Sequence, residues 1–399
     1  MLSAPIATNE TERLGALRAL KILDTPSEDR FDRIVQLAAH FFTVPIAYVA
    51  LVDKNRQWFK SRVGLEACET QRDISFCAHT ILLREPLVIP DAAKDPRFAD
   101  NPLVTGEPHI RFYAGVPLAG PEGHNVGTFC IASPEPREFG AADIRMLERF
   151  AEMAGRELKL AGEFAEAAGY VQSFLPARLT EGPVRAEWSY IPSSELGGDA
   201  FGYRWLDENR FAVHLLDVAG HGLGAAMLSM GVMNWLHHAA DEKDLGCPAK
   251  LLGRLNDAYP MERHGGRFFT IWYGVYDRVS RQLIYSNGGH PAALLVGAQG
   301  NLTRLSDGGP AIGIIENASY ERGSVNVSPG DRFYLFSDGL YEVSKDDGNM
   351  WTYDDFSSFI ARASTQLNFS PEKVIETIRA LKGHKLFSDD VSLIQLCFE

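Results

Sequence analysis

A long apolar seam in the middle of the chain limits how the rest can fold. From Ile144 to Leu175, apolar residues recur at every third or fourth position, with one interruption at Gln172. This spacing, sustained over several heptads, is typical of a coiled-coil helix. Most seam positions are alanine and glycines recur every seven residues, so the helix should be only marginally stable by itself. We expect a connecting helix over 138–175 that forms a coiled coil and can change its packing.

The same spacing has a second interpretation, a single long helix that lies on its own domain. In both interpretations the helix separates two segments, 1–137 and 176–399. A chain of 399 residues has room for both, because domains typically take roughly 100 to 200 residues.

The first segment mixes helical and strand patterns. Helical spacing begins near Thr11 and returns between Phe31 and Phe41. A further short helix is expected near 76–83. Strand-like runs lie at 46–52, 57–62, 87–90, 111–118 and 126–132. Helices that flank an antiparallel sheet make this an α+β domain.

The second segment has more strands and more glycine. Strands are expected at 186–191, 211–216, 269–277, 282–286, 292–296, 332–336 and 391–398. Helices are expected at 224–240, 248–259, 354–363 and 371–382. This segment is also α+β, and we expect two packed sheets, a β-sandwich, flanked by helices.

The net charge and the cysteine content limit which binding partners and which cellular compartment can be expected. The chain carries a net charge of −13 and no basic cluster, so nucleic acid is not an expected partner. Its five scattered cysteines form no C-x-x-C pair, which indicates reduced thiols. No secretory signal is recognisable, and the longest apolar run is far shorter than the ~20 residues of a membrane span. We expect a cytoplasmic protein that does not contact membranes.

Four aspartates of the second segment stand in similar contexts. Asp199 closes a Leu-Gly-Gly-Asp run, and Asp217 follows an apolar strand. Asp338 follows another apolar strand, and Asp389 precedes the last one. Glycine neighbours let the backbone turn sharply at strand ends, so these carboxylates can converge on one rim of a sheet. Each alone is more often an ordinary turn residue, but four together predict a site for Mg²⁺ or Mn²⁺, which prefer oxygen ligands.

Five motifs in this segment resemble those of SpoIIE-type serine phosphatases of the metal-dependent PPM superfamily. They occur in the family's order between about residues 170 and 399, and they are Leu196-Gly197-Gly198-Asp199, Asp217-Val218-Ala219-Gly220-His221-Gly222, Asn287-Gly288-Gly289-His290-Pro291, Ser337-Asp338-Gly339 and Ser388-Asp389-Asp390-Val391-Ser392. The resemblance implies a two-sheet sandwich with outer helices and two Mn²⁺ or Mg²⁺ ions at one end.

The resemblance also implies a role for each aspartate. By motif position, Asp217 should bridge both ions and hold the water between them, which acts as the nucleophile. Asp338 and Asp389 should hold one ion, and Asp199 with the backbone carbonyl of Val218 the other. Ions in such a site make hydroxide available for in-line attack on a phosphoserine or phosphothreonine. The family further implies a phosphorylated anti-sigma-factor antagonist as the substrate, in a partner-switching pathway.

One position departs from the family pattern. Members often carry a second acid three residues after the Gly-Gly-Asp aspartate, where this chain has Gly202. Asp207 lies too far along the chain to substitute, and Asp390 is a weaker ligand candidate because its neighbour occupies the ligand position. The departure leaves open a second interpretation, a catalytically weak or inactive phosphatase fold that serves as a binding or scaffold module.

Other interpretations of these motifs find less support in the chain. The Gly-Gly-Asp run also resembles the hairpin of diguanylate cyclases, but Ala200 replaces an expected acid. His221 has no G-x-S-x-G nucleophile elbow to serve, and we expect it and His290 to stabilise loops. No glycine-rich segment matches a Walker phosphate loop.

Residues around 11–160 resemble a GAF domain, a small sensory module. The resemblance rests on the stretches 23–26, 56–61, 75–79 and 111–118. It implies a small-molecule pocket or a dimer contact and specifies no ligand. Cys77 with His79 could attach a bilin or act as a redox switch, but a buried, inert thiol is the more common case. Trp58, Phe112 and Tyr113 are likewise expected in the core, although they could line a pocket.

Together these patterns predict a signal-regulated phosphatase. The GAF domain, through the helix over 138–175, would control a metal-dependent serine/threonine phosphatase domain in a homodimer. Packing of the helix would position the segment that leads to Asp199.

Overall fold

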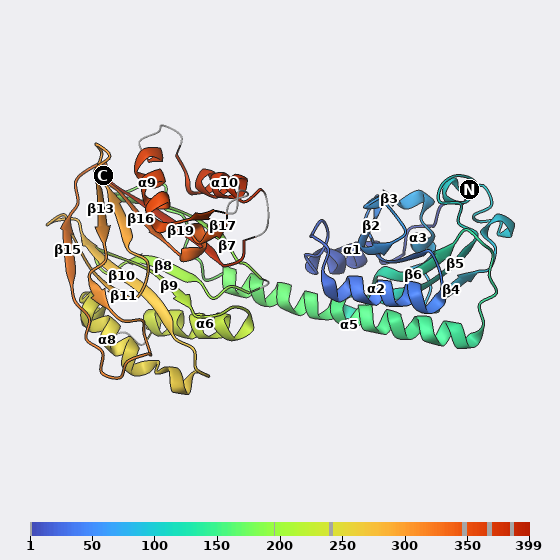
Figure 1. Ribbon diagram of the computed structural model, residues 1–399, viewed down its shortest axis with the longest axis horizontal. Coiled ribbons are helices and arrows are strands. Elements are labelled where there is room, and N and C mark those ends of the chain that lie inside the picture. Colours follow the sequence, from blue (N-terminus) through green and yellow to red (C-terminus); the bar gives the residue numbers. More distant parts are fainter. Residues whose placement is uncertain (1, 195, 239–241, 345–348, 365–368, 384–386) are drawn as a thin grey trace. The chain divides into compact units, whose positions relative to one another are not determined.

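The computed structural model describes residues 2–194, 196–238, 242–344, 349–364, 369–383 and 387–399. The chain divides into two compact units, Met1–Ala167 and Ala168–Glu399 (Figure 1). Each unit combines helices with antiparallel sheets, which confirms the α+β class. No helix in the described ranges has both the length and the apolar character that crossing a membrane requires.

The first unit is built on a six-stranded sheet in the order β3-β2-β1-β6-β5-β4. Its strands are β1 (Ile46–Val52), β2 (Arg56–Val63), β3 (Glu69–Gln71), β4 (Leu87–Ile89), β5 (Phe112–Ala119) and β6 (Asn125–Ser133). One face is covered by α1 (Glu10–Ala19), α2 (Asp29–Phe42) and α5 (Ala141–Gln172). The other face is covered by α3 (Phe76–Thr80) and α4 (Pro102–Thr105).

Strand β1 shows why the sheet needs helices on both faces. All seven of its residues are buried. Side chains alternate between the faces of a strand, so Val49 and Leu51 lie in the core under α2 and α5, whereas Tyr48 and Ala50 lie in the core under α3. A strand buried on both faces is apolar throughout, as this one nearly is.

Helix α5 contains the apolar seam, and its first half lies on its own domain. The seam residues buried in the core of the first unit are Leu147, Ala151, Ala154, Leu158 and Ala161. In this half the structure has the second arrangement, a helix that lies on its own domain, because the same apolar spacing serves the face of a helix packed on a sheet. The coiled coil remains a prediction. Beyond Ala161 the seam residues are half-buried or exposed.

Glycine lowers the stability of this helix, but it also allows neighbouring residues to pack closely against the helix. A Cβ added at Gly162 would lie 2.9 Å from Cδ2 of Leu20. The division between the units after Ala167 falls inside α5 and inside the predicted connecting helix over 138–175, because most of the helix packs against the first unit. Dimerisation remains a prediction.

The second unit contains two sheets packed face to face, as predicted. The first has the order β14-β11-β10-β9-β8, with β15 also paired to β11; its strands are β8 (Ala200–Trp205), β9 (Arg210–Val218), β10 (Phe269–Asp277), β11 (Gln282–Gly288), β14 (Gly308–Gly309) and β15 (Gly323–Asn326). The second has the order β13-β12-β16-β19-β7; its strands are β7 (Val184–Ile191), β12 (Ala293–Val296), β13 (Leu302–Leu305), β16 (Arg332–Phe336) and β19 (Val391–Phe398). A separate short pair joins β17 (Val343–Ser344) to β18 (Met350–Trp351).

Helices cover the outer faces of both sheets (Figure 1). Beside the first sheet lie α6 (Leu223–His238), α7 (Glu242–Leu245) and α8 (Pro248–Ala258). Beside the second lie α9 (Tyr353–Ala363) and α10 (Pro371–Leu381). The core between the sheets includes Leu215 and Trp272 from the first and Phe333 and Ile394 from the second. The predicted helix at 224–240 matches α6, although 239–240 lie outside the described residues.

Candidate active site

Antiparallel pairing brings the two aspartates of the first sheet together. Ala200 on β8 pairs with Leu216 on β9. Asp199, just before β8, and Asp217, near the end of β9, therefore lie at the same end of the sheet. The sequence pattern placed Asp199 at the end of a strand, but it stands before β8, a strand that the pattern did not identify. The convergence holds because β8 and β9 run in opposite directions.

The second sheet repeats this arrangement. Phe336 on β16 pairs with Leu393 on β19, so Asp338 and Asp389 share one end of that sheet. The two sheet ends are joined by the Ser392 hydroxyl, which donates a hydrogen bond of 2.7 Å to Oδ2 of Asp199. The rim of the sandwich thus carries all four predicted aspartates.

Asp199 is deeply buried, with 2% of its surface exposed. Ser392 occupies Oδ2, but Oδ1 is buried and has no hydrogen-bond partner among the described residues. Burial raises the pKa of Asp199 well above its ordinary value, and repulsion from Asp217 and Asp390 raises it further. A buried carboxylate oxygen without a partner is costly, so Oδ1 of Asp199 is available to a ligand.

Asp217 and Asp338 also lie in the negative potential of neighbouring acids. Burial raises the pKa of Asp217 to about 7, helped by repulsion from Asp338 and Asp389. Burial raises the pKa of Asp338 to about 6, helped by Asp389 and Glu342. Glu342, an exposed acid outside the predicted ligand set, thus adds to the negative potential of the rim. Carboxylates this close resist simultaneous ionisation unless a cation compensates them.

Asp390 holds the Gly-Gly-Asp loop through four hydrogen bonds. Its Oδ1 accepts from the backbone N–H and the hydroxyl of Ser193, at 2.7 and 2.9 Å. Its Oδ2 accepts from the backbone N–H groups of Gly198, at 2.5 Å, and of Asp199, at 3.3 Å. The sequence makes Asp390 a weak ligand candidate and gives no sign of this role, because only the fold brings the start of β19 to the loop.

The Val218 carbonyl lies beside the same loop. A Cβ built on Gly198 would be 3.0 Å from this oxygen, so the glycine permits the approach. Gly220 and Gly222 follow with φ of +92° and +80°, which turn the chain from β9 into α6. The predicted backbone ligand therefore lies next to the residue that precedes Asp199.

His290 has a structural role, as predicted. Its ring nitrogens lie 2.8 Å from Thr270 Oγ1 and 3.1 Å from the carbonyl of Phe336, two residues before Asp338. Burial lowers its pKa to about 3, so the ring is neutral and links β10 to the end of β16. His221 stands exposed in the turn between Gly220 and Gly222.

Gly202 packs against a buried histidine on β9. A Cβ there would lie 2.9 and 3.0 Å from Cε1 and Nε2 of His214, an imidazole whose pKa burial lowers to about 3. An acidic side chain would need His214 to move. The glycine at position 202, where family members often carry an acid, therefore leaves room for the ring of His214.

The donor set of the rim fits hard divalent cations. It consists of carboxylate oxygens and one backbone carbonyl, which suits Mg²⁺ or Mn²⁺. Within the described residues, no three His, Cys, Asp or Glu side chains are arranged closely enough to hold a metal ion by themselves. The unpartnered Oδ1 of Asp199 and the raised pKa values of Asp217 and Asp338 are the observations that favour a cation here.

Of the sensory candidates of the first unit, Cys77 and the three aromatic residues are core residues, whereas His79 is half-buried. Cys77 is fully buried, with its Sγ 3.5 Å from that of Cys130, and both thiols are free. His79 contacts the carbonyl of Leu2 at 3.1 Å. The aromatic residues Trp58, Phe112 and Tyr113 are buried among apolar neighbours, as expected.

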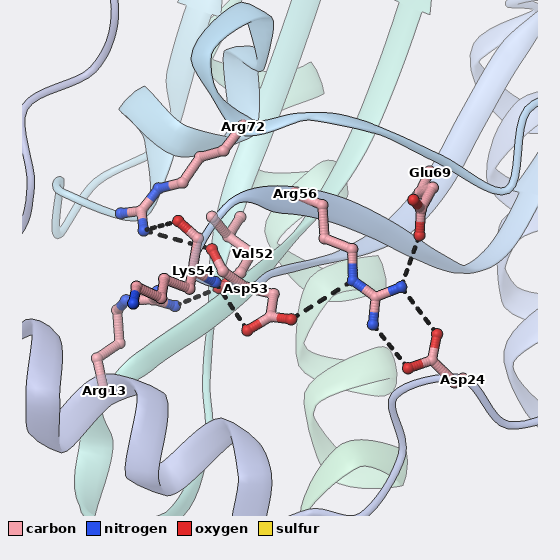
Figure 2. Close-up of polar contacts among 8 residues, drawn as sticks. All are labelled: Arg13, Asp24, Val52, Asp53, Lys54, Arg56, Glu69 and Arg72. Carbon is pink, nitrogen blue, oxygen red and sulfur yellow. Dashed lines mark hydrogen bonds and ion pairs between the residues drawn. The ribbon is translucent and has the colours of Figure 1, made fainter.

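The charged groups beside the β1–β2 turn pair with one another. Figure 2 shows Arg56 between Asp24, Asp53 and Glu69, at 2.6, 3.4 and 2.6 Å. Arg13 donates to the carbonyl of Val52 at 2.6 Å. Because these charged groups bind one another, they form a structural network near the start of the domain and do not indicate a particular ligand.

Comparisons with known proteins agree with this architecture. Residues 26–158 match the family model of the GAF domain, and residues 207–399 match that of stage II sporulation protein E (SpoIIE). Asp217, Asp338 and Asp389 fall within the second match, whereas Asp199 precedes it.

Two curated relatives and one solved structure illustrate the similarity. The chain is 42% identical over 154 residues to cyclic di-GMP phosphodiesterase PA2567 of Pseudomonas aeruginosa, covering 38% of this chain and 26% of that protein. It is 27% identical over 194 residues to phosphoserine phosphatase RsbP of Bacillus subtilis, covering 47% and 45%. The chain thus spans less than half the length of these relatives. The SiaA-PP2C domain of Pseudomonas aeruginosa has the same fold, with a TM-score of 0.55, 22% identity, and coverage of 62% of this chain and all of that one.

Proposed function

We propose that this chain, in which a GAF domain precedes a PPM-type phosphatase domain of the SpoIIE kind, is a signal-regulated, metal-dependent protein serine/threonine phosphatase. The observation that carries the proposal is the convergence of four carboxylates from two sheets on one rim, where a buried oxygen of Asp199 lacks a partner among the described residues. A structural salt-bridge network would pair each carboxylate with a basic side chain, and among the described residues none of these four carboxylates forms an ion pair.

The ligand assignment follows from the positions on the rim. In the proposal Asp217 bridges two Mn²⁺ or Mg²⁺ ions, Asp338 and Asp389 hold one, and Asp199 with the Val218 carbonyl holds the other. When bound, such ions lower the pKa of water and offset charge on phosphoryl oxygens, which is the chemistry that phosphomonoester hydrolysis needs.

The protein's own residues keep these ligands in place. Ser392 fixes one oxygen of Asp199 and leaves the other without a partner in the described residues. Asp390 fixes the backbone of the same loop through Gly198. Groups that orient metal ligands in this way commonly decide metal affinity.

The substrate class is the finer part of the proposal. Relatives named phosphoserine phosphatase support a phosphoserine or phosphothreonine protein as the substrate. The family resemblance points to a phosphorylated anti-sigma-factor antagonist, with the GAF domain as the input and a homodimer as the assembly. The cyclic di-GMP activity in the name of PA2567 is not carried over, because the chain spans 26% of that protein.

Hydrolysis by the purified full-length chain tests the proposal. With Mn²⁺ we expect release of phosphate from p-nitrophenyl phosphate and from a phosphoserine peptide, and loss of both activities in Asp217→Asn and after chelation with EDTA. Asp207→Asn, which changes an exposed carboxylate in the β8–β9 turn, is the matched control and should remain active.

The outcome separates the two interpretations of the domain. Activity that Asp217→Asn abolishes excludes the binding-module interpretation. If the wild-type protein hydrolyses neither compound nor any protein in a phosphorylated cell extract, the phosphatase proposal is wrong and the binding module is favoured.

A further inference from the structure

Arg267 lies next to the rim. It stands two residues before β10, whose first residue Phe269 pairs with Val218 at the end of β9. The backbone N–H of Ala219 also donates to the carbonyl of Phe268, at 3.0 Å. The segment that carries Arg267 therefore runs alongside the turn that follows Asp217.

The guanidinium packs directly on the first turn of α6. A Cβ added at Gly224 would lie 2.6 Å from Nη2 and 2.7 Å from Cζ of Arg267. Only glycine leaves room for the group in this position. The next residue, Ala225, lies beside the Gly-Gly-Asp loop, since a Cβ built on Gly198 would be 3.2 Å from its Cβ. The start of α6 therefore lies between Arg267 and the residue preceding Asp199.

Arg267 has no anionic partner in the described residues. Other arginines of the second unit do have one; Arg178 binds Glu372, Arg210 binds Asp207, and Arg304 binds Asp354. Across the same described ranges Arg263, Arg281 and Arg322 pair with no carboxylate but are exposed. Arg204 and Arg332 are half-buried without a carboxylate partner, but they donate to the backbone carbonyls of Leu236 and Ser364. Arg267 is half-buried, and its guanidinium forms no hydrogen bond with another described residue. A partly buried guanidinium without a counter-ion leaves several N–H donors available for an anionic ligand.

We infer that Arg267 is a substrate-binding residue that donates hydrogen bonds to the nonbridging oxygens of the substrate phosphoryl group. The inference rests on the proposed function and adds a residue to it. The planar fork of a guanidinium matches a phosphoryl group and can donate two bonds at once, which an ammonium group cannot do in the same geometry. Gly224 is then the residue that makes room for this fork.

Steady-state kinetics of three variants test the inference. With Mn²⁺ and a phosphoserine peptide, Arg267→Gln should raise KM, and the inhibition constant of inorganic phosphate, by about tenfold or more, because a charged hydrogen-bond donor is lost. Arg267→Lys should recover part of this loss. Gly224→Ala should reproduce the increase in KM by displacing the guanidinium, although alanine favours the helix and should leave the protein at least as stable.

Arg263→Gln is the matched control, because Arg263 is exposed, lies in the same segment and also pairs with no carboxylate among the described residues. It should change KM by less than about twofold, in line with the small effect of exposed charges. Thermal unfolding and Mn²⁺ affinity by calorimetry should be unchanged in Arg267→Gln.

The results distinguish the inference from the proposed function. Equal KM and equal phosphate inhibition in the wild type, Arg267→Gln and Arg263→Gln would overturn the inference while leaving the phosphatase intact. If the wild type has no activity, calorimetric titration of the Mn²⁺-loaded protein with inorganic phosphate replaces kinetics. Weaker phosphate binding by Arg267→Gln than by Arg263→Gln then supports the inference, and equal binding overturns it.

Discussion

At the scale of single residues, the rim combines an acid that is free to bind a ligand with an acid that is fully engaged. Asp199 retains a buried oxygen that has no partner in the described part of the chain, whereas Asp390 accepts four hydrogen bonds. The adjacent Asp389 and Asp390 look alike in the sequence, yet only Asp390 binds the Gly-Gly-Asp loop. Only the fold distinguishes them, because it brings the carboxylate of Asp390 to the backbone N–H groups of Gly198 and Asp199.

The raised pKa of Asp217 predicts how stability depends on pH in metal-free protein. Its pKa is about 7 in the folded state against an ordinary value of 3.8, so between pH 4 and 7 the folded state binds more protons and stability falls as pH rises. Between pH 5 and pH 7, the free energy of unfolding of Asp217→Asn should rise by about 2 kcal/mol relative to that of the wild type. Urea unfolding of both proteins in the presence of EDTA measures this difference in unfolding free energy.

The comparison with Asp217→Asn is necessary because buried histidines titrate in the same range. Lowered pKa values of His214 and His290 make stability rise with pH below about 6.5, which opposes the carboxylates. This contribution is the same in both proteins and cancels. A stability difference that stays constant with pH would contradict the prediction.

Removal of the Asp390 carboxylate should release the Gly-Gly-Asp loop. Asp390→Ala leaves four donors without their acceptor, and we expect a loss of about 2 to 4 kcal/mol in unfolding free energy together with most of the activity. Asp277→Ala is the control, because Asp277 also accepts two backbone N–H bonds, at 2.9 Å, but in a turn of the β10–β11 hairpin. Chemical unfolding and hydrolysis rates check both variants, and equal activity in the two would refute the role of Asp390.

At the scale of elements, α5 shows how one apolar pattern can serve two different contacts. A stripe at every third or fourth position buries equally well against another helix or against a sheet. In this chain the sheet of the first unit takes the stripe, and Phe150, which lies between seam positions, is buried there too. A buried face wider than a strict seam is typical of a helix packed on a domain.

Two leucines of α5 test this packing. Leu158 is fully buried, whereas Leu160 is 42% exposed. Leu158→Asp should lower the unfolding free energy of the first unit by about 3 kcal/mol or more, because it places a carboxylate in an apolar core. Leu160→Asp should change it by less than about 0.5 kcal/mol. If Leu158→Asp instead changes only the oligomeric state in sedimentation, the seam is a dimer contact.

At the scale of the whole molecule, the chain consists of two units with separate cores, and the carboxylate rim belongs to the second one alone. We therefore expect the GAF domain to control catalysis through the segment that joins the units. That segment includes the part of α5 after Ala161, which the first core does not bury.

Metal binding should stabilise one unit only. With Mn²⁺ at a hundred times its dissociation constant we expect about 2.7 kcal/mol of added stability, seen as an upward shift of one of two calorimetric transitions. Leu158→Asp should lower the transition temperature of the first unit alone, so the transition that it leaves unchanged belongs to the second unit. EDTA or Asp217→Asn should remove the shift. Equal shifts of both transitions would show that Mn²⁺ does not act at the rim.

Much of the architecture could be predicted from local pattern. The strands at 269–277, 332–336 and 391–398 have the predicted bounds, because strongly apolar β-branched and aromatic runs leave little alternative. Strand β8 escaped prediction, because Gly202 and its mixed polarity give it no clear alternation. Pairing with β9 makes this segment a strand, and that pairing depends on the fold rather than on the residue pattern of β8 itself.

The sequence by itself determined the α+β class and the family resemblance, and it selected the four aspartates that lie on one rim, because motif residues and apolar periodicity are local properties of the chain. Tertiary structure alone decided that α5 packs on its own domain, that Asp390 holds the Gly-Gly-Asp loop and that Arg267 has no counter-ion among the described residues. These depend on which distant segments meet. Such contacts are set by the packing of whole sheets and helices, and no short stretch of sequence encodes them.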